Sequence, residues 1–180
     1  MNNEYEIETP RLGLRRWRQE DRVPFAEMNA DPQVMQYYPD VLTRTQSDAF
    51  VDAIENHFSQ HGYGLWAVDL KRTVAFIGYI GFYTATFDAP FTPCVEIGWR
   101  LAQAHWSRGY ATEGAKACLR HGFETLRFRE VYSFTSAVNR PSIRVMQKIG
   151  LKKAGTFDHP SLPPTSPLRP HVLFHAGAED

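Results

Sequence analysis

The sequence predicts a mixed α/β (α+β) fold and not an all-parallel, doubly wound sheet. Strand-like and helix-like segments follow one another in the order β-α-α-β-β-β-α-β-α-β. Three strands in a row predict an antiparallel meander, and the alternation after them predicts strands joined by helical connections. The length of 180 residues suits one hydrophobic core, so we expect residues 1–180 to form a single domain.

The first half of the chain is expected to hold one strand, two helices and most of the meander. Alternating leucines predict a strand at 11–17, and apolar side chains at every fourth position predict an amphipathic helix at 45–61. Gly62 is expected to end that helix. β-Branched and aromatic residues predict strands at 65–70 and 75–85. The other expected elements here are a helix at 20–29, a short helical piece at 33–37 and an aromatic loop at 37–39.

The second half alternates strands with helices. Five of the twelve prolines lie in residues 158–170, which predicts a stiff loop with few ladder hydrogen bonds. A last strand could return at 172–175. The remaining expected elements are strands at 95–101, 131–137 and 151–157 and helices at 109–126 and 141–149.

The composition disfavours several classes of function. Lys and Arg together number 20, as do Asp and Glu, so the formal net charge is zero and a nucleic-acid partner is not favoured. The N-terminal segment is polar, and no apolar run approaches the roughly 20 residues of a membrane span. We therefore expect a cytoplasmic protein without membrane contact. Cys94 and Cys118 lack a metal-binding or CxxC spacing and are expected to be reduced thiols.

The segment 106–112, Trp-Ser-Arg-Gly-Tyr-Ala-Thr, stands between a predicted strand and the long helix. The first N–H groups of a helix have no partner within the helix and carry a partial positive charge, which suits a pyrophosphate. Gly109 would let the backbone come close to such a ligand, Arg108 would add a cation, and the small Ala111 would keep the entry open. An ordinary helix start with a glycine turn fits the same spacing, and neither GxxxxGK nor GxGxxG is present.

Followed by Glu113, this segment resembles the coenzyme-A-binding motif [Q/R]-x-x-G-x-[G/A] of the GNAT N-acetyltransferase superfamily. Gly109 and Ala111 match the motif. Trp106 stands where the general motif has Gln or Arg, as in the RimJ/RimL-type branch, and Ser107 stands where that branch often has glycine. Three further segments fit the same branch, and together they extend the resemblance over roughly residues 8–157: Thr9–Leu12, Glu96–Leu101 and Asn139–Leu151.

The resemblance implies acetyl-CoA as cosubstrate, bound in a cleft where the parallel central strands at 95–101 and 131–137 splay apart in a mostly antiparallel sheet. It implies that the main chain of Trp99 and Leu101 contacts the pantetheine arm and that one of these amides polarises the thioester carbonyl. Asn139 would bond the pantetheine or acetyl region, and it would equally serve as a helix N-cap. The residues assigned to the coenzyme are Trp99, Leu101, Arg108, Gly109, Tyr110, Ala111, Thr112 and Asn139.

The resemblance also suggests catalytic roles. Ser142 is the expected hydrogen-bond donor to the leaving thiolate, although a serine in the first turn of a helix often bonds the backbone instead. The acceptor amine must lose a proton, and Glu96 is the expected base because its strand faces the cleft. His105 is the second candidate base, since an imidazole titrates near neutral pH. Attack is expected to be direct, because neither cysteine has an evident activating neighbour.

Tyr37 and Tyr38 lie in the loop that borders the amine site in this family, and they are candidate substrate contacts or simply packed aromatic residues. His57 and His61 are four residues apart, as are His171 and His175, but neither pair has a third ligand at metal spacing, so no metal is expected.

The sequence thus predicts an N-acetyltransferase whose acceptor is a protein N-terminus or a small-molecule amine. A non-catalytic acyl-CoA-binding module with a regulatory or immunity role is the alternative, and a ligand-free structural domain is the third reading. The sequence leaves the oligomeric state open.

Overall fold

The computed structural model describes residues 4–179 and contains eight strands and four α-helices in that part of the chain. Two short 3-10 turns, at Gln19–Asp21 and Gln103–His105, precede α1 and α3. The elements are β1 (Ile7–Glu8), β2 (Leu12–Arg15), α1 (Arg22–Ala30), α2 (Arg44–His61), β3 (Leu65–Leu70), β4 (Ala75–Ala85), β5 (Cys94–Leu101), α3 (Tyr110–Glu124), β6 (Glu130–Ser136), α4 (Arg140–Lys148), β7 (Lys152–Asp158) and β8 (Pro170–Gly177).

The strands form one sheet in the order β1-β2-β3-β4-β5-β6-β8-β7. Every neighbouring pair is antiparallel except β5 and β6, which run parallel. The predicted mixed, mostly antiparallel sheet with parallel central strands is therefore confirmed. The antiparallel meander is β3-β4-β5, and α3 provides the crossover that a parallel β5–β6 pair requires.

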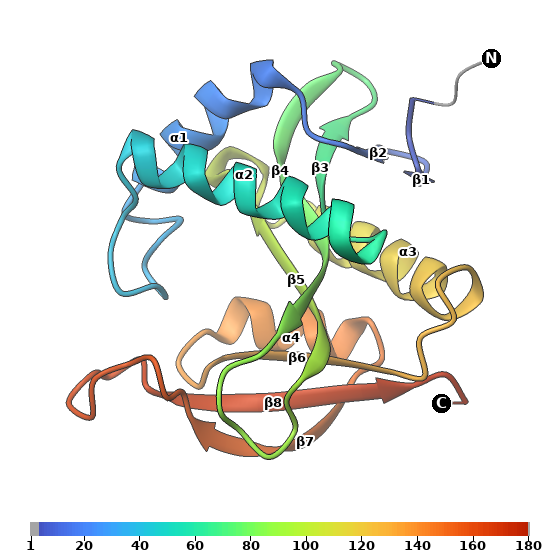
Figure 1. The fold of residues 1–180 in the computed structure, drawn as a ribbon. Coiled ribbons are helices and arrows are strands. Elements are labelled where there is room, and N and C mark those ends of the chain that lie inside the picture. Colours follow the sequence, from blue (N-terminus) through green and yellow to red (C-terminus); the bar gives the residue numbers. More distant parts are fainter. Residues whose placement is uncertain (1–3, 180) are drawn as a thin grey trace.

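The helices cover the two faces of the sheet (Figure 1). Phe25 of α1 and Phe50 of α2 pack edge-on against Tyr79 of β4, with ring centroids 6.0 Å and 5.9 Å from its ring. On the opposite face, Gly114 of α3 lies directly against Ile80 of the same strand. Side chains alternate across a strand, so successive residues of β4 and β5 face different helices.

Two details differ from the prediction. Residues 33–37 form turns and no helix. Asp31 has extended backbone angles, as expected for a residue before a proline, and Pro39 limits the segment on its other side. The strand β1 was not predicted, since two residues are too short to show a period; it pairs through Ile7 with Leu14.

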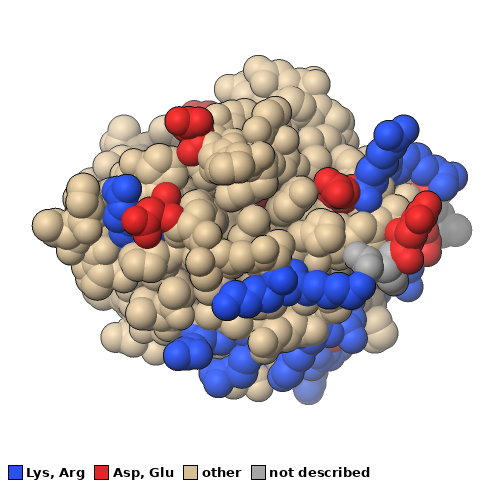
Figure 2. Space-filling view, turned by 90° about the horizontal axis from the view of Figure 1, so that it is seen from below, with Lys and Arg blue, Asp and Glu red and all other residues tan. Residues whose placement is uncertain are grey.

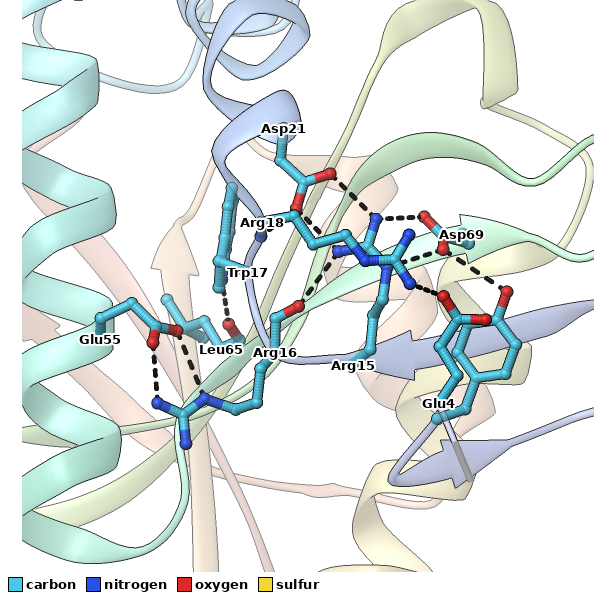
Figure 3. A network of polar contacts seen from close by, with 10 residues as sticks. Glu4, Arg15, Arg16, Trp17, Arg18, Asp21, Glu55, Leu65 and Asp69 are labelled. Carbon is cyan, nitrogen blue, oxygen red and sulfur yellow. Dashed lines mark hydrogen bonds and ion pairs between the residues drawn. The ribbon is translucent and has the colours of Figure 1, made fainter. Parts of the chain in front are cut away.

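A buried arginine joins β2 to the meander (Figure 3). Arg15 of β2 is 4% exposed and lies between the carboxylates of Asp21 and Asp69. Its guanidinium donates two hydrogen bonds to each, at 2.7 and 2.9 Å to Asp21 and 2.7 and 2.8 Å to Asp69. Bidentate pairs of this kind fix orientation as well as energy. The carboxylate of Asp21 also accepts the N–H of Arg18, which ties the start of α1 into the network.

No helix within residues 4–179 has the length and apolar character needed to cross a membrane.

Replacing Arg15 with alanine is expected to lower the free energy of unfolding by about 3–5 kcal/mol, because two buried carboxylates would lose their cation. Urea unfolding followed by circular dichroism measures the change. Arg44→Ala is the matched control, since Arg44 forms an exposed pair with Asp48, and its loss should cost about 0.5 kcal/mol. Equal effects of the two changes would contradict the assignment of Arg15 as a buried structural link.

Candidate active site

The two parallel strands separate along their length. Glu96 of β5 pairs with Tyr132 of β6, and this is the single residue pair between these strands in the described part of the chain. Just beyond it, Ser133 Oγ fills the widening gap and donates to the carbonyl of Ile97 at 2.9 Å. Because the main chain of a strand points to alternate edges, the N–H and C=O groups of Trp99 and Leu101 face the same opening. The Leu101 carbonyl accepts a bond from Trp106 Nε1 at 2.7 Å.

Two cavities meet at this opening. The first has a volume of about 360 Å³ and lies between β5, the start of α3 and the start of α4. The second has a volume of about 250 Å³ and extends over the face of β4 and β5 toward Phe50 of α2. The residues that line both cavities are Tyr38, Trp99, Arg100, Asn139 and Ser142.

The start of α3 borders the first cavity and has the form that the sequence predicts for a phosphate cradle. Gly109 is the N-cap with a φ of 81°, and no side chain of the described residues caps the helix. Ser107 also has a positive φ, 57°, which costs a non-glycine residue roughly 1 kcal/mol. Alternating left-handed residues of this kind turn successive N–H groups toward one point. Tyr110, Ala111 and Thr112, the first three residues of the uncapped helix, line the cavity.

Arg11, which lies just before β2, holds this turn. Its guanidinium donates to the Arg108 carbonyl at 3.0 Å and to Glu113 Oε2 at 2.6 Å, and it lies 4.5 Å above the ring of Tyr110. Glu113 also accepts from Thr9 Oγ1 at 2.6 Å. Although partial burial opposes ionisation, the bonds from Thr9 and Arg11 lower the pKa of Glu113. The Arg11 cation thus offsets an acidic residue that would otherwise repel an anion at the helix start.

The charges around the first cavity are all positive. Arg100, Arg144 and Lys148 line it, and no aspartate or glutamate does. Arg144 and Lys148 are four residues apart on α4, which places them on one side of that helix. More generally, the zero net charge of the chain is unevenly spread, and Figure 2 shows a band of basic side chains across the face seen from below. The first cavity therefore suits an anionic ligand.

Asn139 and Ser142 stand where the cavities join. Asn139 is 8% exposed and caps α4, since its Oδ1 accepts from the Ser142 N–H at 3.3 Å. Its Nδ2 donates to Thr135 Oγ1 at 2.9 Å. The N-cap that the sequence offered as one role for Asn139 is therefore present. The hydroxyl of Ser142 bonds no other group within residues 4–179, which leaves it available to a ligand.

Glu96 lies in the second cavity, with no hydrogen bond or ion pair to another described residue. The side chain is half-buried because it faces this space, and burial raises the pKa of the carboxyl group to about 8. A carboxyl group with a pKa near neutrality can exchange a proton with a ligand under ordinary conditions.

The other predicted residues differ in which of the two cavities they line. Tyr37 and His105 line the first cavity and are absent from the second, so His105 does not lie beside Glu96. Burial and the charge of Arg108 lower the pKa of His105. The side chain of Arg108 is exposed and lines neither cavity. Tyr38 lines both, with its ring 4.2 Å from the guanidinium carbon of Arg100.

Sequence reasoning missed Arg100, Arg11 and the basic side of α4. Arg100 carries a usable signal, because it stands four residues after Glu96 on the same strand and therefore on the same face. Arg144 and Lys148 show the helical spacing of a shared surface. Arg11 has no local signal, since its partner Glu113 is 102 residues away.

Comparisons with known proteins agree with this geometry. Residues 11–152 match the family model described as "Acetyltransferase (GNAT) domain". The N-acetyltransferase YnaD of Bacillus subtilis (strain 168), itself uncharacterized, is 32% identical over 152 residues, which cover 84% of this chain and 85% of YnaD. The crystal structure of a GNAT-family acetyltransferase from Bacillus anthracis is 26% identical with a TM-score of 0.80, covering 97% of this chain and 99% of that one.

Mycobacterium smegmatis RimJ, solved with CoA-disulfide, shares the fold at a TM-score of 0.75 and 20% identity, over 93% of this chain and 82% of that one. The chain belongs to the GNAT family of acetyl-CoA-dependent N-acetyltransferases. The predicted resemblance to its RimJ/RimL-like members is confirmed.

Changing Gly109 to glutamate is expected to abolish coenzyme A binding, because a carboxylate would stand at the uncapped start of α3. Gly109→Gln and Gly109→Ala are the controls: all three side chains carry the same cost of a positive φ, about 1–2 kcal/mol, but only one adds charge. Calorimetric titration with coenzyme A measures the affinity. If the Glu and Gln variants bind coenzyme A with equal affinity, the assignment of the start of α3 as a phosphate-binding site is wrong.

Proposed function

We propose that the protein transfers the acetyl group of acetyl-CoA to a primary amine by direct attack on the thioester. The observation that carries the proposal is the meeting of a cation-lined cavity and a cavity with one free carboxyl group at the parting of β5 and β6. Binding in two halves of one opening would bring the two reactants together, which is a large part of what such an enzyme must do.

The first cavity is the proposed coenzyme side. The N–H groups of Tyr110, Ala111 and Thr112 would hold the pyrophosphate. Arg144 and Lys148 would add positive charge for the phosphates. The exposed edge of β5 at Trp99 and Leu101 offers main-chain partners to an extended amide arm, and the Trp99 N–H would stabilise the carbonyl oxygen as it gains charge.

The second cavity is the proposed acceptor side. An amine with a pKa near 10 is mostly protonated at neutral pH and must lose a proton before its nitrogen can attack. The Glu96 carboxylate would take that proton. The nitrogen then forms a bond to the carbonyl carbon, the carbon–sulfur bond breaks with its electron pair leaving on sulfur, and the second proton lost by the nitrogen passes to that sulfur to give the free thiol. Ser142 would donate a hydrogen bond to the thiolate, and Asn139 would fix the turn that positions Ser142.

The cysteines support direct attack over a cysteine-bound intermediate. Burial raises the pKa of Cys94 to about 11, with a smaller contribution from the charge of Glu96, and burial also raises the pKa of Cys118. Both thiols therefore stay protonated at neutral pH, and neither lines the two cavities. A thiolate is the nucleophilic form of cysteine.

A thiol-release assay with acetyl-CoA and a panel of amines tests the proposal. The panel includes N-terminal peptides, amino acids, polyamines and aminoglycosides, and calorimetry with coenzyme A precedes it. Binding followed by amine-dependent thiol release supports the enzyme. Binding of coenzyme A without thiol release in the presence of any amine favours a non-catalytic acyl-CoA-binding module. The absence of coenzyme A binding overturns the proposed function.

The pH dependence of kcat/KM should report Glu96. Below its pKa of about 8 the carboxyl group is protonated and cannot accept a proton, so activity should rise through pH 8 and then level. Glu96→Gln should lower kcat/KM about 10²–10⁴-fold and remove the rise of activity near pH 8. Its binding of coenzyme A should persist. A limb near pH 8 that survives in the variant would assign the proton transfer to another group.

A further inference from the structure

Arg100 is the second buried arginine of the chain, and its surroundings contrast with those of Arg15. It is 8% exposed, and its Nε is fully buried without a hydrogen-bond partner among residues 4–179. Arg15 has two carboxylates, whereas no carboxylate of the described residues forms an ion pair with Arg100. A buried cation without a counter-ion is costly. The structure therefore contains a positive charge that the described chain does not balance.

The guanidinium is held in place by a short chain of polar groups. Asn29 of α1 accepts a bond from Arg100 Nη1 at 2.6 Å, and its own Nδ2 donates to Ser47 Oγ of α2 at 2.9 Å. Asn29 and Ser47 are both fully buried. The aromatic ring of Tyr38 covers the guanidinium at 4.2 Å. Neutral groups thus orient Arg100, and none of them cancels its charge.

Tyr79 lies opposite Arg100 on β4 and is also no counter-ion. Burial raises the pKa of its hydroxyl group, so the phenol stays neutral at physiological pH.

Arg100 borders both cavities, and its side chain lies on the acceptor face of the sheet. Glu96, Gly98 and Arg100 share one face of β5, and Arg100 contacts residues of α1 and α2 on that face. The start of α3 lies against the opposite face. Glu96 and Arg100 are the two charged residues among those that line the second cavity. Four residues separate them, about 13 Å along an extended strand.

We propose that the acceptor amine carries a carboxylate and that Arg100 binds it while the amine lies at Glu96. The proposal rests on the proposed function and names the substrate class of the same site. An amine at one end and a carboxylate at the other would match the two charges of the cavity. A guanidinium suits a carboxylate because it can donate two parallel hydrogen bonds. A polyamine, by contrast, would bring a second cation toward Arg100.

Wild-type protein is tested first with ω-amino acids of increasing chain length, each beside its carboxamide, which has the same shape without the charge. We expect kcat/KM to be about 10- to 100-fold higher for the carboxylate of the best-fitting pair, the range of a hydrogen-bonded charge. In a second arm, peptides that begin with Asp are compared with peptides that begin with Asn. A preference for the Asp peptides would point to an acidic protein N-terminus as the source of the carboxylate, and a preference confined to the free ω-amino acids would point to a small molecule.

The Arg100→Met variant is then assayed with the best pair. The ratio of kcat/KM between carboxylate and carboxamide should fall to about 1, and this ratio is insensitive to partial loss of active protein. Equal use of carboxylate and carboxamide by the wild type overturns the proposal, as does a ratio that the variant leaves unchanged. A variant that loses coenzyme A affinity, with its ratio kept, would assign Arg100 to the coenzyme instead.

These outcomes are separate from failure of the proposed function. In that case the wild type would show no thiol release from any amine, charged or neutral.

Discussion

The parting of two parallel strands is the constraint on which the site depends. Parallel strands that stayed paired would bond their edges to each other and leave no polar main chain free for a ligand. Here β5 and β6 share the pair Glu96–Tyr132 and then diverge around Ser133. The divergence exposes the edge of β5 at Trp99 and creates space on both faces of the sheet at one point. The opening is held by the meander on one side and by β8 on the other.

Charge is sorted around that opening although the chain is neutral overall. Arg144 and Lys148 line the space beside α3 and α4, Glu96 lies in the space beside α2, and Arg100 borders both spaces. The acidic Glu113 near the helix start is paired with Arg11, so it does not disturb this separation. A neutral composition is therefore compatible with an uneven distribution of charge, in which one space is lined by cations and the neighbouring space holds both a carboxyl group and a guanidinium.

Local patterns predicted most of the fold and several of the residues that line the two cavities. Helix α2 and the meander followed from periodicity, and Gly109 and Asn139 stood out because a turn and a cap need particular residues. The prediction of a short helix at 33–37 was wrong, because Pro32 and Pro39 restrict the backbone more strongly than the residues between them favour a helix. The sequence places Arg100 on the same face of its strand as Glu96, but only the packing of α1 and α2 against β5 reveals that no carboxylate of the described residues accompanies it. The clamp of Arg11 on Glu113 joins distant segments, so no window of sequence could show it.

The position of β8 has a consequence for how the molecule is made. β8 lies between β6 and β7, and it pairs with β6 through seven residue pairs from Glu130–Gly177 to Ser136–His171. Since β6 touches β5 at one residue pair, β8 supplies nearly all of its ladder. The wall of the cleft that β6 forms is therefore fixed only after a strand some 40 residues later in the chain has inserted, and such non-local pairings form slowly. During synthesis, the meander and its helices can assemble first, and the reacting cleft is among the last parts to take shape.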